Sequence, residues 1–361
     1  MSTPSWLRVA PWVVAGCLCA GCHPTAPQPG NAPAPTKAAA PLEAKQETIA
    51  WYGLSAHPYV TLVQTGVEGF EKDSGTAVYK TTGQQPTQDE ESANIEALST
   101  KGYKGFAIYP ADAAGANGLF AALTKRGQFV VAYGAEPVEG TSASFTVATD
   151  IPRAAKQACE ELIRAMGDKG AILNVLESVT DPNTKKRDDG IKEVVAKHPN
   201  VHIEQTISDM MQQTEAVNKI QGALASLGDK VDGIICTGYN PTVAAVGVLK
   251  EWHKDPKHKR IHFIGIDTDP TVLDAIRDGA IEATIAQNPY GHGYVACAAL
   301  KLLIDGWTPR NGYQFIEAGS WVVTKANVDT FDAQVKEHTR QIADELKTKY
   351  LQPPAGSNAA K

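Results

Sequence analysis

Several patterns that mark catalytic and metal sites are missing from this sequence. It contains no Gly-x-Gly-x-x-Gly phosphate fingerprint, no Gly-x-Ser-x-Gly elbow and no His-Glu-x-x-His site. After residue 46 it has no Cys-x-x-Cys pair and no His/Cys spacing typical of a metal site. We therefore expect a protein that is not an enzyme and that holds neither a cofactor nor a metal.

Cysteine is scarce, and no cluster of positive charge is present. Only three of the six cysteines follow residue 46, namely Cys159, Cys236 and Cys297. Their number is odd and each lies in an apolar helix or strand pattern, which predicts buried free thiols rather than a disulfide framework. The net charge of -6 gives no support for nucleic-acid binding.

Residues 1–22 lack the length of a membrane span. Arg8 is their only charge, and the apolar run from Val9 to Gly21 is too short to cross a bilayer. A signal peptide explains this segment best. Small residues precede Cys17 and Cys22, which resembles the lipobox of bacterial lipoproteins, and the longer apolar run favours Cys22. The alternative is a cleaved signal with incidental cysteines.

Two further segments lack the periodicity of a folded domain. Residues 23–46 are rich in proline and alanine, which is typical of an extended tether. A tether fits a protein that a lipid holds at a membrane of the periplasm or cell envelope. At the other end, residues 351–361 are expected to form a flexible tail.

Short apolar runs alternate with longer helical stripes through the rest of the chain. The predicted strands are 48–54, 78–81, 105–109, 129–133, 171–176, 201–207, 233–236, 261–266, 283–286 and 320–324. Helices between such strands indicate parallel sheets covered on both faces. Residues 101–110 and 125–134 also parallel the segments that start at Lys230 and Lys259 in order and spacing. The sequence therefore predicts two similar doubly wound α/β domains.

The run from Ile261 to Tyr294 places polar residues where strands end. Asp267 follows one apolar run and Gln287 follows the next. Thr268 or Asp269 can cap the helix between them, and Gly279 fits just past its end. Ligands of open α/β sheets bind beyond the carboxyl ends of the strands, so we expect Asp267 and Gln287 to face one crevice.

This run, Gly-Ile-Asp-Thr-Asp-Pro followed by Ile-Ala-Gln-Asn-Pro-Tyr, resembles the type I periplasmic sugar-binding proteins, the ribose-binding-like family. The resemblance covers roughly residues 47–345. It implies a ligand cleft between two discontinuous domains, with chain crossings near 149–151, 287–289 and 317–320. The implied domains are 47–150 plus 288–318, and 151–287 plus 319–350.

Matching positions of the family imply which residues of the second domain touch a ligand. Asp267 and Gln287 match well, and simple capping or loop hydrogen bonding is their alternative role. Arg187 lies in Arg-Asp-Asp-Gly-Ile, which resembles the family's Arg-x-x-Gly-Phe, and its alternative is a surface arginine. Asn240 falls near a family Asn/Asp position, although Tyr239 could take that place.

The remaining candidates depart from the family pattern. The loop after the first strand contains Ser55, His57 and Tyr59, where His57 replaces an amide and could instead bond only to backbone. The other candidates are Tyr109, Glu136 and Met210, which replace an asparagine, an aspartate and an aromatic residue of the family. These changes argue against ribose itself and leave another sugar, a polyol or another small polar metabolite open.

Together these features predict an extracytoplasmic solute-binding lipoprotein that feeds an ABC importer. We expect a monomer whose partners are a monosaccharide or polyol and an ABC permease, with membrane contact only through the lipid. The alternative is a sensory receptor of the same fold, which the sequence does not separate from a transport protein.

Overall fold

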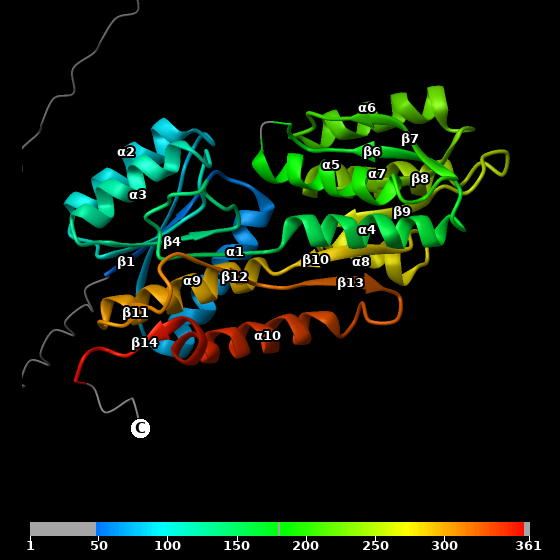
Figure 1. Ribbon diagram of the computed structural model, residues 1–361. Coiled ribbons are helices and arrows are strands. Elements are labelled where there is room, and N and C mark those ends of the chain that lie inside the picture. The colour runs from blue at the N-terminus through cyan, green and yellow to red at the C-terminus, as the bar shows by residue number, and fades with distance from the viewer. Residues whose placement is uncertain (1–47, 180, 357–361) are drawn as a thin grey trace, which may run out of the picture. The chain divides into compact units, whose positions relative to one another are not determined.

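Two six-stranded sheets form the framework of the structure, a computed structural model that describes residues 48–179 and 181–356 (Figure 1). In spatial order the first sheet contains β12 (Gln314–Glu317), β5 (Phe145–Ala148), β4 (Phe129–Tyr133), β3 (Gly105–Ile108), β1 (Ile49–Gly53) and β2 (Val78–Thr82). The second contains β13 (Ser320–Thr324), β10 (Ala283–Gln287), β9 (His262–Ile266), β8 (Val231–Cys236), β6 (Gly170–Val175) and β7 (Val201–Ile207). The predicted signal peptide, both lipidation cysteines and the tether lie outside the described residues.

The two sheets repeat one topology, as the internal similarity predicts. The pairs β1–β2, β1–β3, β3–β4 and β4–β5 are parallel, and so are β6–β7, β6–β8, β8–β9 and β9–β10. The edges differ, because β12 is parallel to β5 whereas β13 is antiparallel to β10. The prediction of two similar doubly wound α/β units is confirmed.

Helices cover both faces of each sheet. The first sheet carries α1 (Pro58–Ser74), α2 (Gln88–Thr100), α3 (Gly115–Lys125) and α9 (Pro289–Ile304). The second carries α4 (Ile151–Ala165), α5 (Pro182–Val195), α6 (Gln213–Leu227), α7 (Tyr239–Trp252) and α8 (Pro270–Arg277). We call each sheet with its helices the first half and the second half. Within the described ranges, every helix is too short or too polar to cross a membrane.

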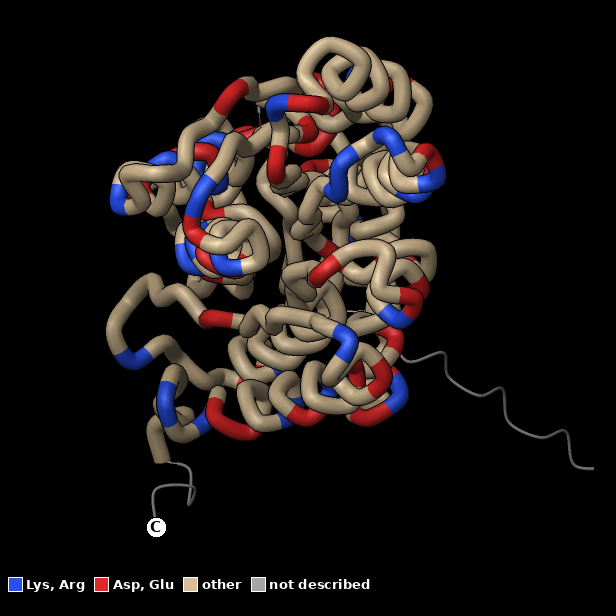
Figure 2. The backbone as a smooth tube through the Cα atoms, turned by 90° about the vertical axis from the view of Figure 1, so that its right-hand side faces the viewer, with Lys and Arg blue, Asp and Glu red and all other residues tan. Residues whose placement is uncertain are grey.

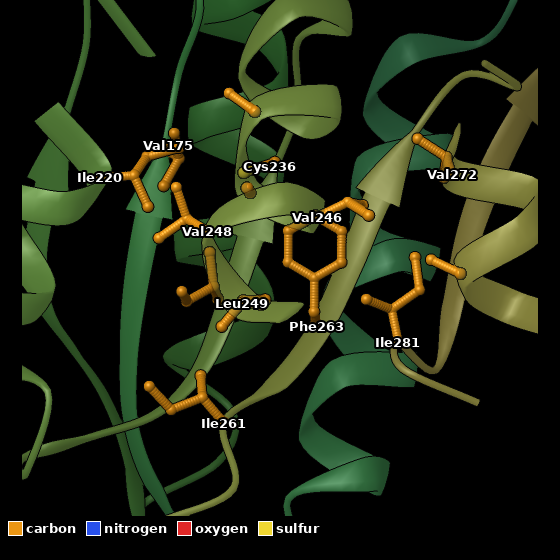
Figure 3. Packing of buried hydrophobic residues seen from close by; sticks show 14 of the residues in the cluster. Val175, Ile220, Cys236, Val246, Val248, Leu249, Ile261, Phe263, Val272 and Ile281 are labelled. Atoms are coloured by element: carbon orange, nitrogen blue, oxygen red, sulfur yellow. The ribbon is translucent and has the colours of Figure 1, made fainter. Parts of the chain in front are cut away.

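The central strands are buried on both sides, which explains their continuous apolar runs. Ile49 and Trp51 of β1 belong to a cluster with α1 and α9, whereas Ala50 and Tyr52 face a cluster with α2 and α3. The second half has the same arrangement, and Figure 3 shows part of one cluster around Phe263 of β9. Lysine, arginine, aspartate and glutamate are interspersed along the described backbone in Figure 2.

The helix between the two key strands begins and ends as predicted. Asp269 is its N-cap, because its side chain accepts a hydrogen bond from the backbone amide of Thr271. Gly279 follows the helix with a φ of 73°, a left-handed conformation that glycine adopts without strain. The described cysteines, Cys159, Cys236 and Cys297, are buried and free, as expected.

The chain passes between the sheets at the three places that the resemblance implies, after Ala148, after Gln287 and after Glu317. The strands β5 and β12 were not predicted from the sequence. They lie at one edge of the first sheet and immediately precede the crossings after Ala148 and Glu317. A small sheet of β11 (Thr308–Pro309) and β14 (Leu351–Gln352) was not predicted either.

The C-terminal segment differs from the expected division of the chain. Residues 319–350 were assigned to the second domain, yet α10 (Phe331–Glu345) contributes Phe331 and Val335 to a core of the second half and Ile342 to a core of the first. The following π-helix η1 (Leu346–Tyr350) adds Leu346 to the first half. Leu351 is fully buried there, so the ordered fold extends beyond the expected start of the tail.

Helices α1 and α9 approach each other through two glycines. A Cβ atom at Gly66 would lie 1.9 Å from the carbonyl oxygen of Tyr290, and one at Gly293 would lie 2.2 Å from that of Val63. These atoms are backbone, so they have little freedom to move aside. The glycines set the distance between the two helices that cover one face of the first sheet.

We predict that Gly293→Ala lowers the free energy of unfolding by about 1–3 kcal/mol, because the methyl group forces α1 and α9 apart. Urea-induced unfolding measures this change. Gly222→Ala is the matched control, since Gly222 is exposed on α6 with no atom near its Cβ position. That control should gain about 0.5–1 kcal/mol from helix propensity, and equal effects of the two substitutions would contradict the packing argument.

Candidate functional site

A cavity of about 310 Å³ lies at the carboxyl ends of the strands of both sheets. Loops that follow β1, β2, β3, β4, β6, β7 and β8 contribute lining residues, as does Asp267 immediately after β9 and Gln287 at the end of β10. This is the position at which α/β sheets bind ligands. The prediction that Asp267 and Gln287 face one crevice is confirmed.

Seven of the ten predicted binding residues line this cavity. They are Ser55, His57, Tyr59, Tyr109, Arg187, Asp267 and Gln287. They come from both halves, so the fold brings together positions up to 232 residues apart in the chain, those of Ser55 and Gln287. Whether they contact a ligand stays a prediction.

Two predictions in the second half are one position away from the residue that lines the cavity. Asn240 lies outside the lining, where its side chain donates to the carbonyl of Met211 at 2.9 Å, and its neighbour Tyr239 lines the cavity instead. Met210 is fully buried in the hydrophobic core, and Met211 lines the cavity. Asp209 precedes this pair with a φ of 63°, a left-handed turn that redirects the following side chains.

Glu136 is also placed away from the cavity. Its carboxylate accepts a hydrogen bond from the hydroxyl of Tyr313 at 3.0 Å and lies 3.4 Å from the ammonium of Lys186. Neither Tyr313 nor Lys186 was expected to contact Glu136 from the sequence. Glu136 therefore lies outside the lining of this cavity.

Four polar residues that line the cavity were not among the predicted binding residues. Glu177, Ser178 and Asp181 belong to the loop after β6, and Asn183 lies in the first turn of α5. Their position in the sequence could have indicated a binding role, because this polar loop follows the carboxyl end of a predicted strand. No family motif marked it, so these residues were not chosen.

Asp267 and Gln287 form the buried polar pair of the cavity. The side-chain amide of Gln287 donates to Asp267 Oδ1 at 2.7 Å. Asp267 adopts a φ of 68°, a conformation that aspartate and asparagine tolerate better than most residues. Its backbone amide donates to the carbonyl of Ile285, and its carbonyl accepts from the hydroxyl of Thr284, which fixes the turn.

Burial raises the pKa of Asp267 from 3.8 to about 6. The amide of Gln287 and the charge of Arg187 partly oppose this rise, whereas the carboxylate of Glu177 adds to it. Asp267 is 6% exposed, so little water screens these charges. A ligand group that donates hydrogen bonds to this carboxylate would favour its ionised form.

Arg187 is a buried cation with unused hydrogen-bonding capacity. It is 8% exposed, and among the described residues its Nε has no hydrogen-bond partner. Its Nη1 lies 3.7 Å from a carboxylate oxygen of Asp181, the N-cap of α5. A buried polar atom without a partner is costly, so an acceptor oxygen of a ligand would be stabilised there.

Three tyrosines supply flat surfaces rather than free hydroxyls. The hydroxyl of Tyr59 hydrogen-bonds Nδ1 of His292 at 2.8 Å, and that of Tyr239 donates to Asp269 at 2.8 Å. Burial lowers the pKa of His292 to about 3, so its ring is neutral. The ring of Tyr109 packs edge-on against Tyr133. Burial raises the pKa of all three cavity tyrosines, which keeps them uncharged.

His57 both caps a helix and lines the cavity. Its Nδ1 accepts a hydrogen bond from the backbone amide of Tyr59 at 3.1 Å, which is the backbone role considered as its alternative. Its Nε2 lies 3.3 Å from the side-chain nitrogen of Asn240 and 3.9 Å from Glu177 Oε1. No group of three or more His, Cys, Asp or Glu side chains suited to a metal occurs in the described part of the chain.

We predict that Asp267→Asn removes a pH dependence of stability. The folded state holds the Asp267 proton more tightly than the unfolded state, so its stability contribution is present below pH 3.8 and is lost as the pH rises through about 6. One pKa unit corresponds to 1.4 kcal/mol, so the variant should be more stable than the wild type by up to roughly 3 kcal/mol at pH 7. Asparagine tolerates the backbone conformation.

Urea unfolding between pH 3.5 and 7.5 measures this difference. Asp229→Asn is the control, because Asp229 is exposed and should change stability little at any of these pH values. Parallel stability curves for Asp267→Asn and the wild type would contradict the assignment.

Comparisons with known proteins agree with this architecture. The family model described as periplasmic binding protein domain matches residues 50–308. A xylitol-binding protein of Mycolicibacterium smegmatis is 21% identical over 308 residues, 85% of each chain. A ribose import binding protein of Haemophilus influenzae is 24% identical over 242 residues, which cover 66% of this chain and 80% of that protein.

A solved structure shows the same fold. An ABC transporter solute-binding protein from Burkholderia graminis, solved in complex with D-arabinose, superposes with a TM-score of 0.72 at 22% identity. The match covers 80% of this chain and 98% of that one. The two doubly wound halves, the three crossings and the cavity at the strand ends agree with this match. This chain belongs to the periplasmic binding protein family, among the type I sugar-binding proteins that the run from Ile261 to Tyr294 resembles.

Proposed function

We propose that this protein is an extracytoplasmic solute-binding lipoprotein that delivers a sugar or sugar-like polyol to an ABC importer. One observation carries the proposal, namely that a single cavity combines buried hydrogen-bonding groups with tyrosine rings. Asp267 accepts hydrogen bonds, Arg187 donates them, and Gln287 can do both. The rings of Tyr59, Tyr109 and Tyr239 suit the apolar C–H faces of such a ligand.

The names of the relatives indicate which ligands to examine first. Their names describe binding of xylitol and ribose, and the solved neighbour holds D-arabinose. Pentoses and pentitols are therefore the first ligands to examine, followed by hexoses. The relative from Haemophilus influenzae is an import protein, which favours transport over the alternative of a sensory receptor.

Binding would proceed by closure of two domains around the ligand. We assign 47–150 plus 288–318 to one domain and 151–287 plus 319–350 to the other, with the exception that Ile342 and Leu346 pack in the core of the first. Asn183 of the second half donates to the carbonyl of Gly134 in the first at 3.2 Å, and Lys186 lies 3.4 Å from Glu136. Such contacts would favour a closed form, and hinge motion at the three crossings would open it. No catalytic group is required.

The N-terminal segment supports a location of the protein at a membrane of the periplasm or cell envelope. A lipid on Cys22, or on Cys17, would anchor the chain to a membrane of the periplasm or cell envelope, and residues 23–46 would tether the two domains. The protein would act as a monomer, and its closed form would be recognised by the permease in the inner membrane.

We predict that a pentose or pentitol raises the melting temperature of the purified chain in a thermal-shift screen of pentoses, hexoses and polyols. At a ligand concentration 100 times the dissociation constant, binding stabilises the folded state by about 2.7 kcal/mol. A micromolar dissociation constant, about 8 kcal/mol, is expected. Arg187→Ala should weaken binding at least tenfold, because it removes the buried donor.

Lys185→Ala is the matched control, since Lys185 carries the same charge on the same helix with a side chain that is 75% exposed. It should bind as the wild type does. A ligand that binds equally well to the Arg187 and Lys185 variants would place the binding site elsewhere. A complete screen without a shift would contradict the proposed sugar or polyol ligand.

A further inference from the structure

The cavity lining carries more negative than positive charge. Among the described residues, its acidic side chains are Glu177, Asp181 and Asp267, and Arg187 is its one lysine or arginine. With these groups ionised, the lining holds two negative charges in excess. A ligand enters this environment and displaces water, so the excess charge influences which ligand is stabilised.

His57 lies beside this excess. Its Nδ1 accepts the backbone amide of Tyr59, and its Nε2 lies 3.9 Å from Glu177 Oε1 and 3.3 Å from the side-chain nitrogen of Asn240. A ring carries at most one positive charge, so the lining keeps an excess of negative charge in either state of this histidine.

Arg187 is nearest to only one of the three carboxylates. Its Nη1 lies 3.7 Å from Asp181, whose side chain also accepts from the backbone amide of Asn183 and from the hydroxyl of Thr184. Asp181 therefore has a cationic partner and two further donors. The excess charge remains on the other two acids.

In the described structure, the side chains of Glu177 and Asp267 accept their hydrogen bonds from neutral donors. Glu177 accepts from the backbone amide of Asn240 at 3.1 Å, and Asp267 accepts from the amide of Gln287 at 2.7 Å. Within residues 48–179 and 181–356, no lysine or arginine nitrogen lies within 4 Å of either carboxylate. The charge of Glu177 also raises the pKa of Asp267, so the two groups repel each other when both are ionised.

We propose, resting on the proposed sugar or polyol function, that the cavity prefers a ligand with a protonated primary amine, such as an amino sugar, over its neutral counterpart and rejects sugar acids. An ammonium group has three donors and would interact with Glu177 and Asp267 together. The ring of Tyr239, which also lines the cavity, offers a surface for a cation. Arg187, whose Nε has no partner among the described side chains, would take a hydroxyl oxygen of the same ligand.

Matched sugars test this preference directly. Isothermal titration of the purified chain compares D-glucose with D-glucosamine and D-glucuronate, and D-galactose with D-galactosamine and D-galacturonate. In at least one set the amine should bind at least tenfold more tightly than the neutral sugar, and the acid at least tenfold more weakly. Raising the pH until the amine loses its proton should abolish the preference.

Glu177→Gln identifies the group responsible. The substitution removes one negative charge and keeps the shape, so it should lower the ratio of amine affinity to neutral-sugar affinity about tenfold. Glu204→Gln is the control, because Glu204 lies on β7 outside the cavity, and it should leave the ratio unchanged. A ratio that is unchanged by Glu177→Gln would overturn the role of that carboxylate.

The outcomes separate this inference from the function on which it rests. Neutral sugars that bind as tightly as or more tightly than their amines would overturn the charge preference and leave the proposed function standing. Absence of binding by every neutral, amine and acid sugar, together with the pentoses and pentitols of the thermal-shift screen, would overturn both.

Discussion

The parallel arrangement of the strands is the constraint on which the rest of this structure depends. Parallel neighbours point their carboxyl ends to the same edge, so loops that are distant in the chain meet there. Asp267 and Gln287 become neighbours in this way, although a whole helix separates them in sequence. The same constraint brings Tyr109, Glu177 and Tyr239 to one cavity.

Polar groups at that edge are buried at a cost that the rest of the fold offsets. Asp267 lies in a left-handed conformation with a raised pKa, and Arg187 keeps a buried nitrogen without a partner in the described structure. Continuous apolar strands and close helix packing at Gly66 and Gly293 supply the compensating stability. Unsatisfied groups gathered in one cavity are typical of a site that is completed by a ligand.

Sequence reasoning succeeded where an apolar run ends in a polar residue. The strands that lead to Asp267 and Gln287 are largely apolar and clearly bounded, so their ends were predictable. Arg187 was found through its motif, because the helix carrying it has a weak apolar pattern. The three chain crossings came from the family resemblance alone, since no local signal specifies which sheet a strand joins.

The errors have local physical causes. β5 and β12 are four residues each and include polar residues, unlike the apolar four-residue β3, so neither gave a clear apolar run. Because β12 was not predicted, the contact between Glu136 and Tyr313, the residue just before it, was not expected. Met210 was chosen because it falls at a family position held by an aromatic residue, but after the left-handed turn at Asp209 it is Met211 that lines the cavity. Such single-residue offsets depend on backbone conformation, which the residue pattern does not specify.

The expected division into domains was also wrong near the C-terminus. Helix α10 has one amphipathic stripe, and the sequence does not reveal that the two ends of this stripe pack on different halves. Leu351 lies beyond the last predicted helix and was assigned to a tail, yet it fills the core of the first half. The sequence of a short segment has no periodic pattern that shows which distant core it packs against.

The structure of the complex with whichever sugar, amino sugar or polyol binds most tightly would show whether the cavity at the strand ends is the binding site. We expect the ligand in this cavity, with polar atoms within hydrogen-bonding distance of Asp267 and Arg187 and a C–H face against a tyrosine ring. A ligand bound elsewhere, or one in the cavity that leaves Asp267 and Arg187 without contact, would contradict this expectation.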